Sequence, residues 1–528
     1  MDFNKINLLR NTIIHLKPIQ VYYRLFYFLR NRLFIFNRVN SAINDFSPIV
    51  WKNGFDYENS YFEKNSSFTF LNISHSFLDK INWNFSHLGK LWTYNLNYFD
   101  YLNQKNISRS TGISLIRNFV VNDRLLLDGI ESYPISLRGI NWVKFLSKHQ
   151  INDDLINDCL YNHYCVLTKN LEYHLLGNHL LENAFSLLFG AYYFQDEKLF
   201  FKSKELLFVE LKEQTLKDGA HFELSPMYHQ IVLSRLLDSI NLIRLNDFQK
   251  NDELLAFLED KAGLMISWLE NVTYLNGNVP MVNDATYNIA PNSKKLFAYG
   301  RLLGIVNQSI PLSDSGYRKV NVKDYELFID VGNIGPSYQP GHAHSDTFNF
   351  ELIKHGSAII VDMGISTYEK NRIRQEERST SSHNTVKIGS REQSQVWGGF
   401  RVAKRAKVHG LTEKANCITA SHDGYLDIGL VHKRSFLWEE GQVTIVDEIN
   451  RQTGNDAKAF FHLHSSVGEP LIDKNTVILE SSKSLISFEN AFRIYIDEYQ
   501  LSEGFNKSKL AYKIVVVFDQ TLKTKISP

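Results

Sequence analysis

Apolar residues recur every three or four positions along the first 320 or so residues of the chain, a spacing that lines one face of a helix. Gly, Pro and polar residues interrupt this pattern and divide it into separate helices. The clearest predicted helices cover residues 112–125, 134–149, 180–194, 228–245 and 253–272. They share no repeat of fixed length or motif, so the pattern predicts an irregular helical toroid or bundle rather than a regular solenoid.

From about Asp324 onward the pattern changes to short β-rich runs separated by Gly, Asn and Asp. Many short strands without intervening helices predict an antiparallel β-sandwich. A chain of 528 residues is also too long for one hydrophobic core. We therefore predict three parts: an N-terminal amphipathic helical segment over 1–50, a helical domain over 51–315 and a β-sandwich over 316–528.

The composition of the chain limits the kinds of partner that we expect it to bind. The 58 Lys and Arg nearly balance the 57 Asp and Glu, which gives no overall attraction to a polyanion, so we expect no nucleic-acid partner. Aromatic residues make up 13% of the chain, and core packing explains such a share more often than sugar stacking does. The three cysteines do not indicate a disulfide framework.

The first 40 residues do not have the form of a secretory signal, because Arg10, His15 and Lys17 interrupt the apolar run and no cleavage site follows. We therefore expect a cytoplasmic or inner-membrane-associated protein. Between Val21 and Phe36, aromatic and aliphatic residues alternate with arginines. This segment is compatible with peripheral membrane contact, or equally with a helix docked on the rest of the protein.

The most conspicuous candidate chemistry lies between Gly341 and His383, in a segment that begins GHAHSDTFNFEL. His342, His344, Asp362 and His383 fall within it, and His and Asp are ligands that a zinc-type metal prefers. In a strand, side chains at i and i+2 share a face, so His342 and His344 are expected to point into one cavity.

The helical half contains three further polar clusters. GNHLLENA places Glu182 one helical turn beyond Asn178 and His179, although a satisfied structural cluster explains this stripe equally well. The segment DGAHFELSPMYH offers His221, Glu223, Tyr228 and His229. It leads into a predicted helix, a common place for site residues. NGNVPMVNDATYN contains Asp284, for which a plain turn is the alternative.

Taken together, these motifs resemble a known family. NHLLEN, ELSPMYH and GHAHSDTFNFEL with VDMG and RSTSSHN, in this order, resemble the heparinase II/III-like family of polysaccharide lyases. LWTYNLNYFDYL and ESYPISLRGINWVKFL also resemble its helical domain, so the resemblance extends from about Leu91 to about Val408. It implies an incomplete (α/α) toroid that carries catalysis, followed by an antiparallel β-sandwich. The implied reaction is β-elimination at a uronic acid.

The resemblance also implies a role for each matched residue. Asn178 and His179 hold the substrate carboxylate, and Glu182 orients His179. Tyr228 protonates the leaving oxygen and, in some substrates, also takes the C5 proton. His342 is the second acid or base, on the opposite side of the sugar.

The remaining residues of the 341–383 segment match a zinc site that the resemblance implies. His344, Asp362 and His383 would bind a divalent metal that braces the β domain beside the cleft. Two His and one Asp with a fourth position for water form a reasonable zinc shell. A metal-free hydrogen-bond network among the same side chains is the alternative.

Arginines and rings are the expected substrate contacts. Arg372, Arg374, Arg378, Arg391 and Arg401 cluster in sequence around Trp397. Arginine binds carboxylate or sulfate with two hydrogen bonds, and we single out Arg378, with Trp397 and Asp284 as supporting residues. For any single arginine, a solvated surface position is the commoner explanation.

The sequence therefore predicts a polysaccharide lyase that acts on an anionic, uronate-containing polysaccharide or oligosaccharide, linked to bacterial surface polysaccharide metabolism. A glycoside hydrolase on the same fold is one alternative, but it needs two opposed carboxylates, and the matched motifs supply only Glu182, Glu223 and Asp284 as acids. A non-catalytic glycan-binding or assembly factor is the other. Such a protein has no need of Tyr228 and His342 together.

Overall fold

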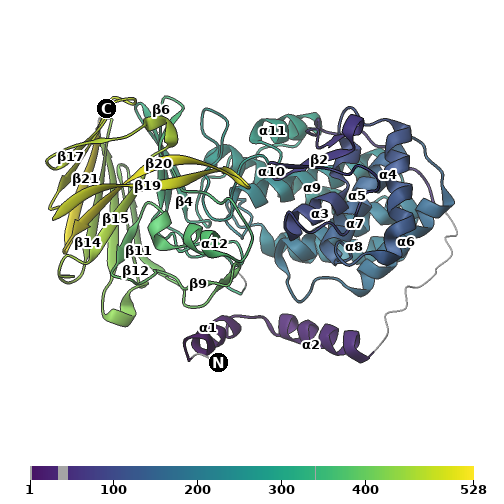
Figure 1. The fold of residues 1–528 in the computed structure, drawn as a ribbon, viewed down its shortest axis with the longest axis horizontal. Coiled ribbons are helices and arrows are strands. Elements are labelled where there is room, and N and C mark those ends of the chain that lie inside the picture. Colours follow the sequence, from purple (N-terminus) through teal and green to yellow (C-terminus); the bar gives the residue numbers. More distant parts are fainter. Residues whose placement is uncertain (1–2, 34–45, 339, 440, 528) are drawn as a thin grey trace.

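The computed structural model describes residues 3–33, 46–338, 340–439 and 441–527. Within these ranges a helical half and a β half lie end to end, and a pair of N-terminal helices runs alongside both (Figure 1). The predicted order of helical domain and β-sandwich is confirmed.

The N-terminal pair consists of α1 (Phe3–Ile13) and α2 (Pro18–Leu33). The pair contacts the rest of the protein through hydrogen bonds, such as that from Gln20 to the Leu175 carbonyl, and through rings, such as Tyr23 stacked on Tyr173. The remainder of the predicted 1–50 segment lies largely outside the described residues. None of the helices in the described ranges is both long and apolar enough to cross a bilayer.

The helical half contains the helices that the apolar period predicts. Its elements are α3 (Lys90–Tyr98), α4 (Arg109–Asn122), α5 (Ser132–Lys148), α6 (Asp154–Lys169), α7 (Gly177–Phe194), α8 (Glu197–Gln214), α9 (Pro226–Leu245), α10 (Asp252–Val272) and α11 (Ser293–Leu302). Almost every residue of α7 is buried, as expected for a central helix that is apolar all round. The first residues of α7 are thereby fixed by packing along the whole helix.

A small antiparallel sheet precedes these helices and did not follow from the helical period. It comprises β1 (Tyr61–Phe62), β2 (Ser67–Phe70) and β3 (Ile73–Ser76). Phe68 and Phe70 on β2 are buried and contact the rings of Tyr101 and Trp92. Strands of two to four residues are too short for an alternating pattern to reveal them.

The β half is an antiparallel sandwich. One eight-stranded sheet has the order β11 (Val408–Lys414), β12 (Cys417–His422), β13 (His432–Glu439), β14 (Gln442–Ile449), β21 (Thr521–Ser527), β18 (Ser484–Glu489), β17 (Thr476–Leu479) and β16 (Leu471–Asp473). Strict alternation of buried and partly exposed residues along β14 shows that one face of this sheet is covered.

Two four-stranded antiparallel sheets complete the β half. The first has the order β19 (Arg493–Gly504), β20 (Lys507–Phe518), β15 (Ala457–His462) and β8 (Val386–Ile388). The second has the order β4 (Tyr317–Val322), β5 (Tyr325–Asp330), β6 (Phe350–Lys354) and β7 (Ser357–Ile360). A bridge between Ile360 and Leu463 links the two sheets. One apolar core fills the sandwich and another fills the helical half.

Connections of the second four-stranded sheet carry the predicted chemistry. His342 and His344 lie in the loop between β5 and β6, so the expectation that they occupy a strand is wrong. The short helix α12 (Arg372–Glu377) follows β7, and the small ribbon of β9 (Val396–Trp397) and β10 (Arg401–Val402) lies beyond it. These connections lie on the side of the sandwich that faces the helices (Figure 1).

Candidate active site

A cleft of about 1370 Å³ lies where the two halves meet. Residues from both halves line it, including Asn178, His179, Tyr228 and His342, so the four predicted catalytic residues share one cavity. Aromatic rings form much of the remaining wall, namely Tyr94, Tyr98, Tyr133, Phe222, Tyr338, Tyr368 and Phe400. Rings of this kind suit the apolar faces of sugars, although most aromatic residues of the chain serve core packing.

Asn178 lies in the first turn of α7, directly after a glycine whose backbone conformation is left-handed. Gly177 has a φ of +60°, and an added Cβ would come within 2.5 Å of Glu223 Oε1. This close approach lets the Asn178 N–H donate to Glu223 Oε1 at 3.0 Å and its amide donate to Oε2 at 2.8 Å. The Asn178 amide is therefore engaged with Glu223 and stands 3.4 Å from His342 Nε2.

Glu223 is buried in the cleft wall as an anion. Burial alone would raise its pKa, but attraction to His342 and His221 and the hydrogen bonds from Asn178 outweigh this and lower the pKa. The carboxylate stands 3.6 Å from His342 Nε2. Glu223 thus adds a fixed negative charge beside the imidazole.

His179 faces the cleft with its side chain 37% exposed, and its Nδ1 is 3.0 Å from Glu172 Oε1. Burial alone would lower its pKa, but the Glu172 carboxylate outweighs this, so the pKa is raised and the imidazolium is favoured. The predicted orienting role of Glu182 is wrong, because Glu182 instead accepts from Arg235 Nε at 2.8 Å inside the helical core. Glu172 takes that place.

Tyr228 lies in the first turn of α9, a helix with a well-defined start. Ser225 caps it by accepting from the Tyr228 N–H, and Pro226 occupies the first position, where its missing N–H costs nothing. The phenol oxygen is 3.2 Å from that of Tyr368. Burial, followed by the effect of Tyr368, raises the pKa of Tyr228 well above its usual value, so the phenol is protonated at neutral pH.

His342 packs against Tyr228 with ring centroids 3.9 Å apart. Its Nδ1 is 2.8 Å from Asp284 Oδ2. Because an ionised carboxylate only accepts hydrogen bonds, Nδ1 carries the proton and donates, which leaves Nε2 in the neutral ring as an acceptor towards the cleft.

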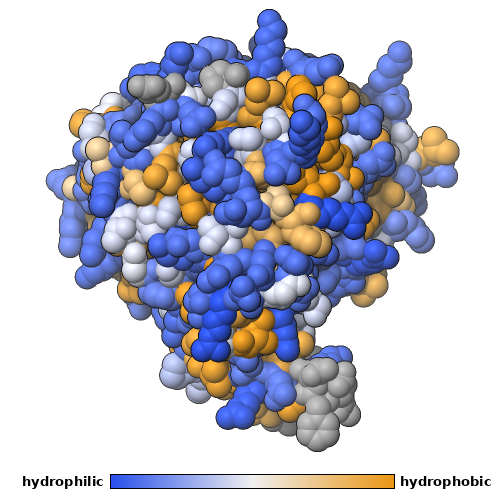
Figure 2. All heavy atoms as spheres, turned by 90° about the vertical axis from the view of Figure 1, so that its left-hand side faces the viewer, coloured by the Kyte–Doolittle hydropathy of each residue, from blue (hydrophilic) through white to orange (hydrophobic). Residues whose placement is uncertain are grey.

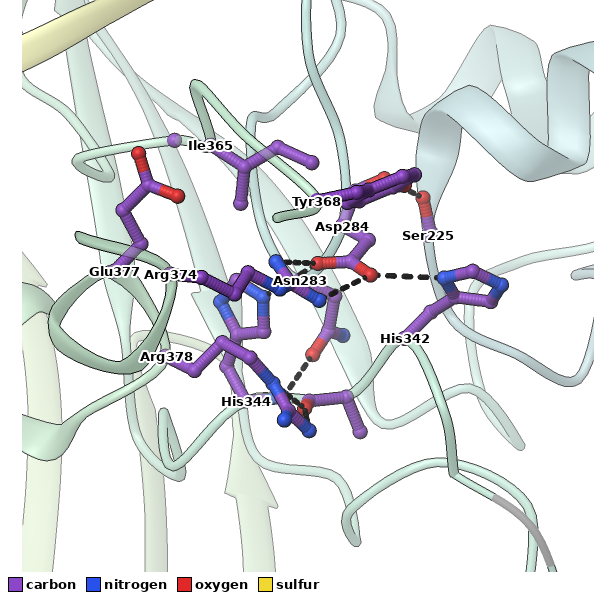
Figure 3. Close-up of polar contacts among 12 residues, drawn as sticks. Ser225, Asn283, Asp284, His342, His344, Ile365, Tyr368, Arg374, Glu377 and Arg378 are labelled. Atoms are coloured by element: carbon purple, nitrogen blue, oxygen red, sulfur yellow. Dashed lines mark hydrogen bonds and ion pairs between the residues drawn. The ribbon is translucent and has the colours of Figure 1, made fainter. Parts of the chain in front are cut away.

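Asp284 is the centre of a buried polar network (Figure 3). In addition to His342, it contacts His344 Nε2 at 2.8 Å and both terminal nitrogens of Arg374 at 2.6 and 2.7 Å. Burial alone would raise its pKa, but the Arg374 guanidinium and the two histidines hold the pKa well below its usual range. Arg374 itself is buried against the rings of Tyr368 and Phe400. Asp284 is thus permanently charged and rigidly held.

Two predicted substrate contacts are wrong in this structure. Arg378 is completely buried and donates to the Ala343 carbonyl at 2.8 Å, and burial lowers its pKa to about 9. Trp397 donates from Nε1 to Thr12 Oγ1 at 3.1 Å and lies under the Arg401 guanidinium, away from the cleft lining. Both residues support the loops around the cleft rather than the cavity itself.

The three predicted metal ligands lie behind the cleft and are fully buried. His383 Nδ1 is 2.7 Å from Asp362 Oδ2, an oxygen that also accepts from the Asn349 amide at 2.6 Å. Two ring nitrogens, His344 Nδ1 and His383 Nε2, are buried without a hydrogen-bond partner, as is Asp346 Oδ2. Buried orphan atoms of these types are the donors that a zinc-type ion uses.

The spacing of these donors is wider than that of a compact metal site. Among the described residues, the three-ligand set whose atoms all lie within 4.8 Å of one another is Asp123, Cys159 and His163 in the helical half. That set stands next to Arg138, whose Nε is 3.5 Å from His163 Nδ1, so a cation there would face a guanidinium. The donor types around His344 and His383 thus fit a metal, whereas their present spacing is that of a hydrogen-bond network.

Three residues that hold the groups of the site in place were not predicted from the sequence. Glu172 precedes His179 by seven positions, Tyr368 follows the VDMG motif, and Arg374 was one of five arginines without preference. No pattern in the sequence marks Glu172 or Tyr368 as partners of catalytic groups. Arg374 could have been chosen over Arg378 only by knowing that α12 turns it towards Asp284.

Comparison with known proteins places this chain in a family. The model of the heparinase II/III N-terminus matches residues 132–299, and that of the heparinase II/III-like C-terminal region matches residues 305–527. A heparin-sulfate lyase of Bacteroides stercoris is 24% identical over 369 residues, which cover 64% of this chain and 54% of that protein. A second, from Pedobacter heparinus, is 24% identical over 66% of this chain and 56% of its own length. The chain thus spans about half the length of these curated relatives.

Solved structures show the same fold. Heparinase III superposes with a TM-score of 0.71 and 16% identity over 97% of this chain and 91% of its own. A heparan sulfate lyase from Pedobacter heparinus gives a TM-score of 0.54 and 18% identity over 86% of this chain and 79% of its own. With both family models matched along the chain and the fold shared throughout, the protein belongs to the heparinase II/III-like family.

Proposed function

We propose that the protein is a polysaccharide lyase that cleaves a uronate-containing glycan by β-elimination. The observation that carries the proposal is the pairing of Tyr228 and His342 on one cleft, with ring centroids 3.9 Å apart and His342 held in one tautomer by Asp284. The family relationship and the names of the lyase relatives support it.

Elimination first requires that the substrate carboxylate be neutralised, because the C5 proton beside a charged carboxylate is very weakly acidic. His179 meets this need, since Glu172 favours its protonated form and occupies Nδ1, which leaves Nε2–H as the donor for a carboxylate oxygen. Asn178 and Glu223 complete the wall beside it.

Removal of the C5 proton then requires a base. His342 Nε2 is an acceptor facing the cleft, while Asp284 and Glu223 provide negative charge that stabilises the imidazolium formed by proton transfer. Asp284 does not itself take the proton, because Arg374 holds its pKa far below neutrality. Its role is to position the ring and stabilise its charge.

Departure of the C4 oxygen requires an acid on the same cleft. Tyr228 is protonated at neutral pH because burial raises the pKa of its phenol. Tyr368 is 3.2 Å from the phenol oxygen and fixes its direction. We therefore assign proton donation to Tyr228 and proton abstraction to His342.

An anionic polysaccharide or oligosaccharide is the proposed substrate class. Its support is His179, whose protonated form Glu172 favours, among the aromatic rings of the cleft, with Lys370 also in the lining; Lys90 is already paired with Glu131. Participation in bacterial surface polysaccharide metabolism is part of the proposal and rests on this substrate class alone.

We also propose that a divalent metal ion, with zinc as the first choice, binds in the buried region around His344, Asp362 and His383. Its support is the pair of buried, unpartnered ring nitrogens on His344 and His383. When bound, such an ion would brace the β5–β6 loop behind the cleft. The proton transfers described above do not pass through it.

The experiment is a panel of uronate polymers incubated with the full chain while ultraviolet absorbance of a C4–C5 double bond is followed. Tyr228→Phe should abolish turnover with little loss of affinity, whereas Tyr94→Phe, on the cleft wall with its hydroxyl bound to Glu131, should retain it. Reducing ends without an unsaturated product would indicate a hydrolase. Binding without any product would indicate a glycan-binding protein.

A further inference from the structure

The N-terminal helices α1 and α2 are attached to both halves of the molecule by one stripe of side chains. On α2, Gln20 donates to the Leu175 carbonyl at 3.1 Å and Tyr27 donates to the Leu171 carbonyl at 2.6 Å. At the other end, Thr12 on α1 accepts from Trp397 in the β half. The pair is thus held in place along one side of the protein, as Figure 1 shows.

The opposite side of these helices is apolar and uncovered by the rest of the described chain. Residues spaced three and four apart share a helical face, and on α2 this outer face carries Tyr22, Leu25, Phe28 and Leu29. Their exposed fractions run from 44 to 62%. The outer face of α1 carries Ile6 and Ile13, which are 44 and 55% exposed.

Cations accompany this apolar surface. Residues 3–33 contain six Lys and Arg and no Asp or Glu, although the whole chain is nearly neutral. Three of the six face the helical half, where Lys17 pairs with Glu213 and Arg24 and Arg30 donate to backbone carbonyls. Lys5, Arg10 and Arg32 are exposed, and Arg10 lies between Ile6 and Ile13 on the outer face of α1. In Figure 2 the N-terminal helices form the projection at the bottom of the molecule, on which hydrophobic and hydrophilic residues are mixed.

We propose that the outer faces of α1 and α2 dock on an anionic lipid bilayer, with both helices lying in the plane of the interface. Exposed aromatic and aliphatic residues flanked by cations are the composition of an interfacial helix, and the charge complements anionic headgroups. A second copy of this chain fits less well, because pairing two such surfaces brings like charges together.

Docking of these helices would also place the cleft near the membrane, and the value of this for catalysis rests on the proposed function. Tyr27 and Arg30 belong to α2 and also line the cleft. Docking of the outer face therefore sets the cleft beside the membrane, where a membrane-proximal anionic glycan would reach it.

Vesicle flotation of the full chain tests the proposal. The protein should float with vesicles of phosphatidylcholine and phosphatidylglycerol, and much less with phosphatidylcholine alone. Tyr22→Ser, Leu25→Ser and Leu29→Ser combined should abolish flotation. Lys5→Gln, Arg10→Gln and Arg32→Gln combined should weaken it by roughly a hundredfold, at about fivefold for each cation near an anionic surface.

A matched control replaces exposed apolar residues elsewhere, Leu78, Val121 and Leu275, by Ser; they are 75 to 95% exposed. This control should float like the unaltered protein. The proposal is overturned if the protein ignores anionic vesicles, if it binds neutral vesicles equally, or if the control loses as much binding. It is also overturned if light scattering shows a dimer that the Tyr22, Leu25 and Leu29 variant separates without any flotation. Lyase activity on soluble polymer should be unchanged in these variants, which keeps a failed docking test distinct from a failed lyase.

Discussion

Replacement of Asp284 by Asn tests how the buried network controls His342. Asp284 accepts hydrogen bonds from His342, His344 and both terminal nitrogens of Arg374, and all but His342 are completely shielded from solvent. Asn has the same size but lacks the charge, and its amide nitrogen donates. One of the three partners must therefore lose its acceptor.

Two effects of different size follow. The Arg374 guanidinium would remain buried without a charged partner, which costs about 3–5 kcal/mol of folding stability. If the amide donates to His342 Nδ1, the ring proton moves to Nε2, which then cannot accept the C5 proton. General base catalysis is worth roughly 100- to 10,000-fold, so we expect kcat to fall by that factor at temperatures where the variant is folded.

The chain offers a matched control for the stability effect. Asp447, on β14 opposite Arg434 of β13, is buried and accepts from Arg434 Nε at 2.7 Å and from His432 Nε2 at 2.7 Å. It is not among the residues that line the cleft. Asp447→Asn should lower the melting temperature comparably and leave kcat unchanged.

The assay pairs thermal unfolding with initial rates on whichever uronate polymer the protein accepts. A normal kcat in folded Asp284→Asn would refute the role of Asp284 in setting the His342 tautomer. An equal loss of kcat in Asp447→Asn would show that general destabilisation, rather than the tautomer, lowers the rate.

Three other predictions concern the surroundings of the cleft. Glu172→Gln removes the charge that raises the pKa of His179, so the fall in kcat/KM with rising pH should shift to lower pH. An unchanged pH profile would exclude His179 as the cation that binds the substrate carboxylate. Gly177→Ala places a Cβ 2.5 Å from Glu223 Oε1 at a residue with positive φ, so it should displace Glu223 and Asn178 and lower kcat/KM at least tenfold. The control is Gly277→Ala, which also has positive φ but no atom within 4 Å of the added Cβ, and which should lower stability alone. Zinc should co-purify with the protein, and chelation should lower the melting temperature; a chain that is metal-free after folding in zinc would leave His344, Asp362 and His383 as a hydrogen-bond network.

The sequence was sufficient to predict the architecture because the apolar period is a local property. Helices such as α7 and α9 are buried on nearly all sides, and strands such as β14 bury one face. The spacing of apolar residues along each element therefore predicts the element directly. The three-stranded sheet of β1, β2 and β3 was missed because its strands are too short to show a period.

The partners within the site could not be predicted in the same way, because they depend on loop paths and on how elements dock. His342 and Asp284 are 58 residues apart and meet only because the β5–β6 loop folds back on the segment after α10. Glu182 lies one turn beyond His179 yet points into the helical core, where Arg235 pairs with it. Arg374 and Arg378 are one turn apart near α12, but only Arg374 reaches Asp284.

The most direct test of the proposed β-elimination is digestion of a uronate polymer in water enriched in heavy oxygen, followed by mass spectrometry of the products. Elimination breaks the bond between the C4 carbon and its oxygen without water, so the products should carry no label and should include a chain whose terminal sugar is lighter by one water molecule. Incorporation of one labelled oxygen at each cleavage, without an unsaturated end, would contradict the account of Tyr228 and His342 and would indicate hydrolysis.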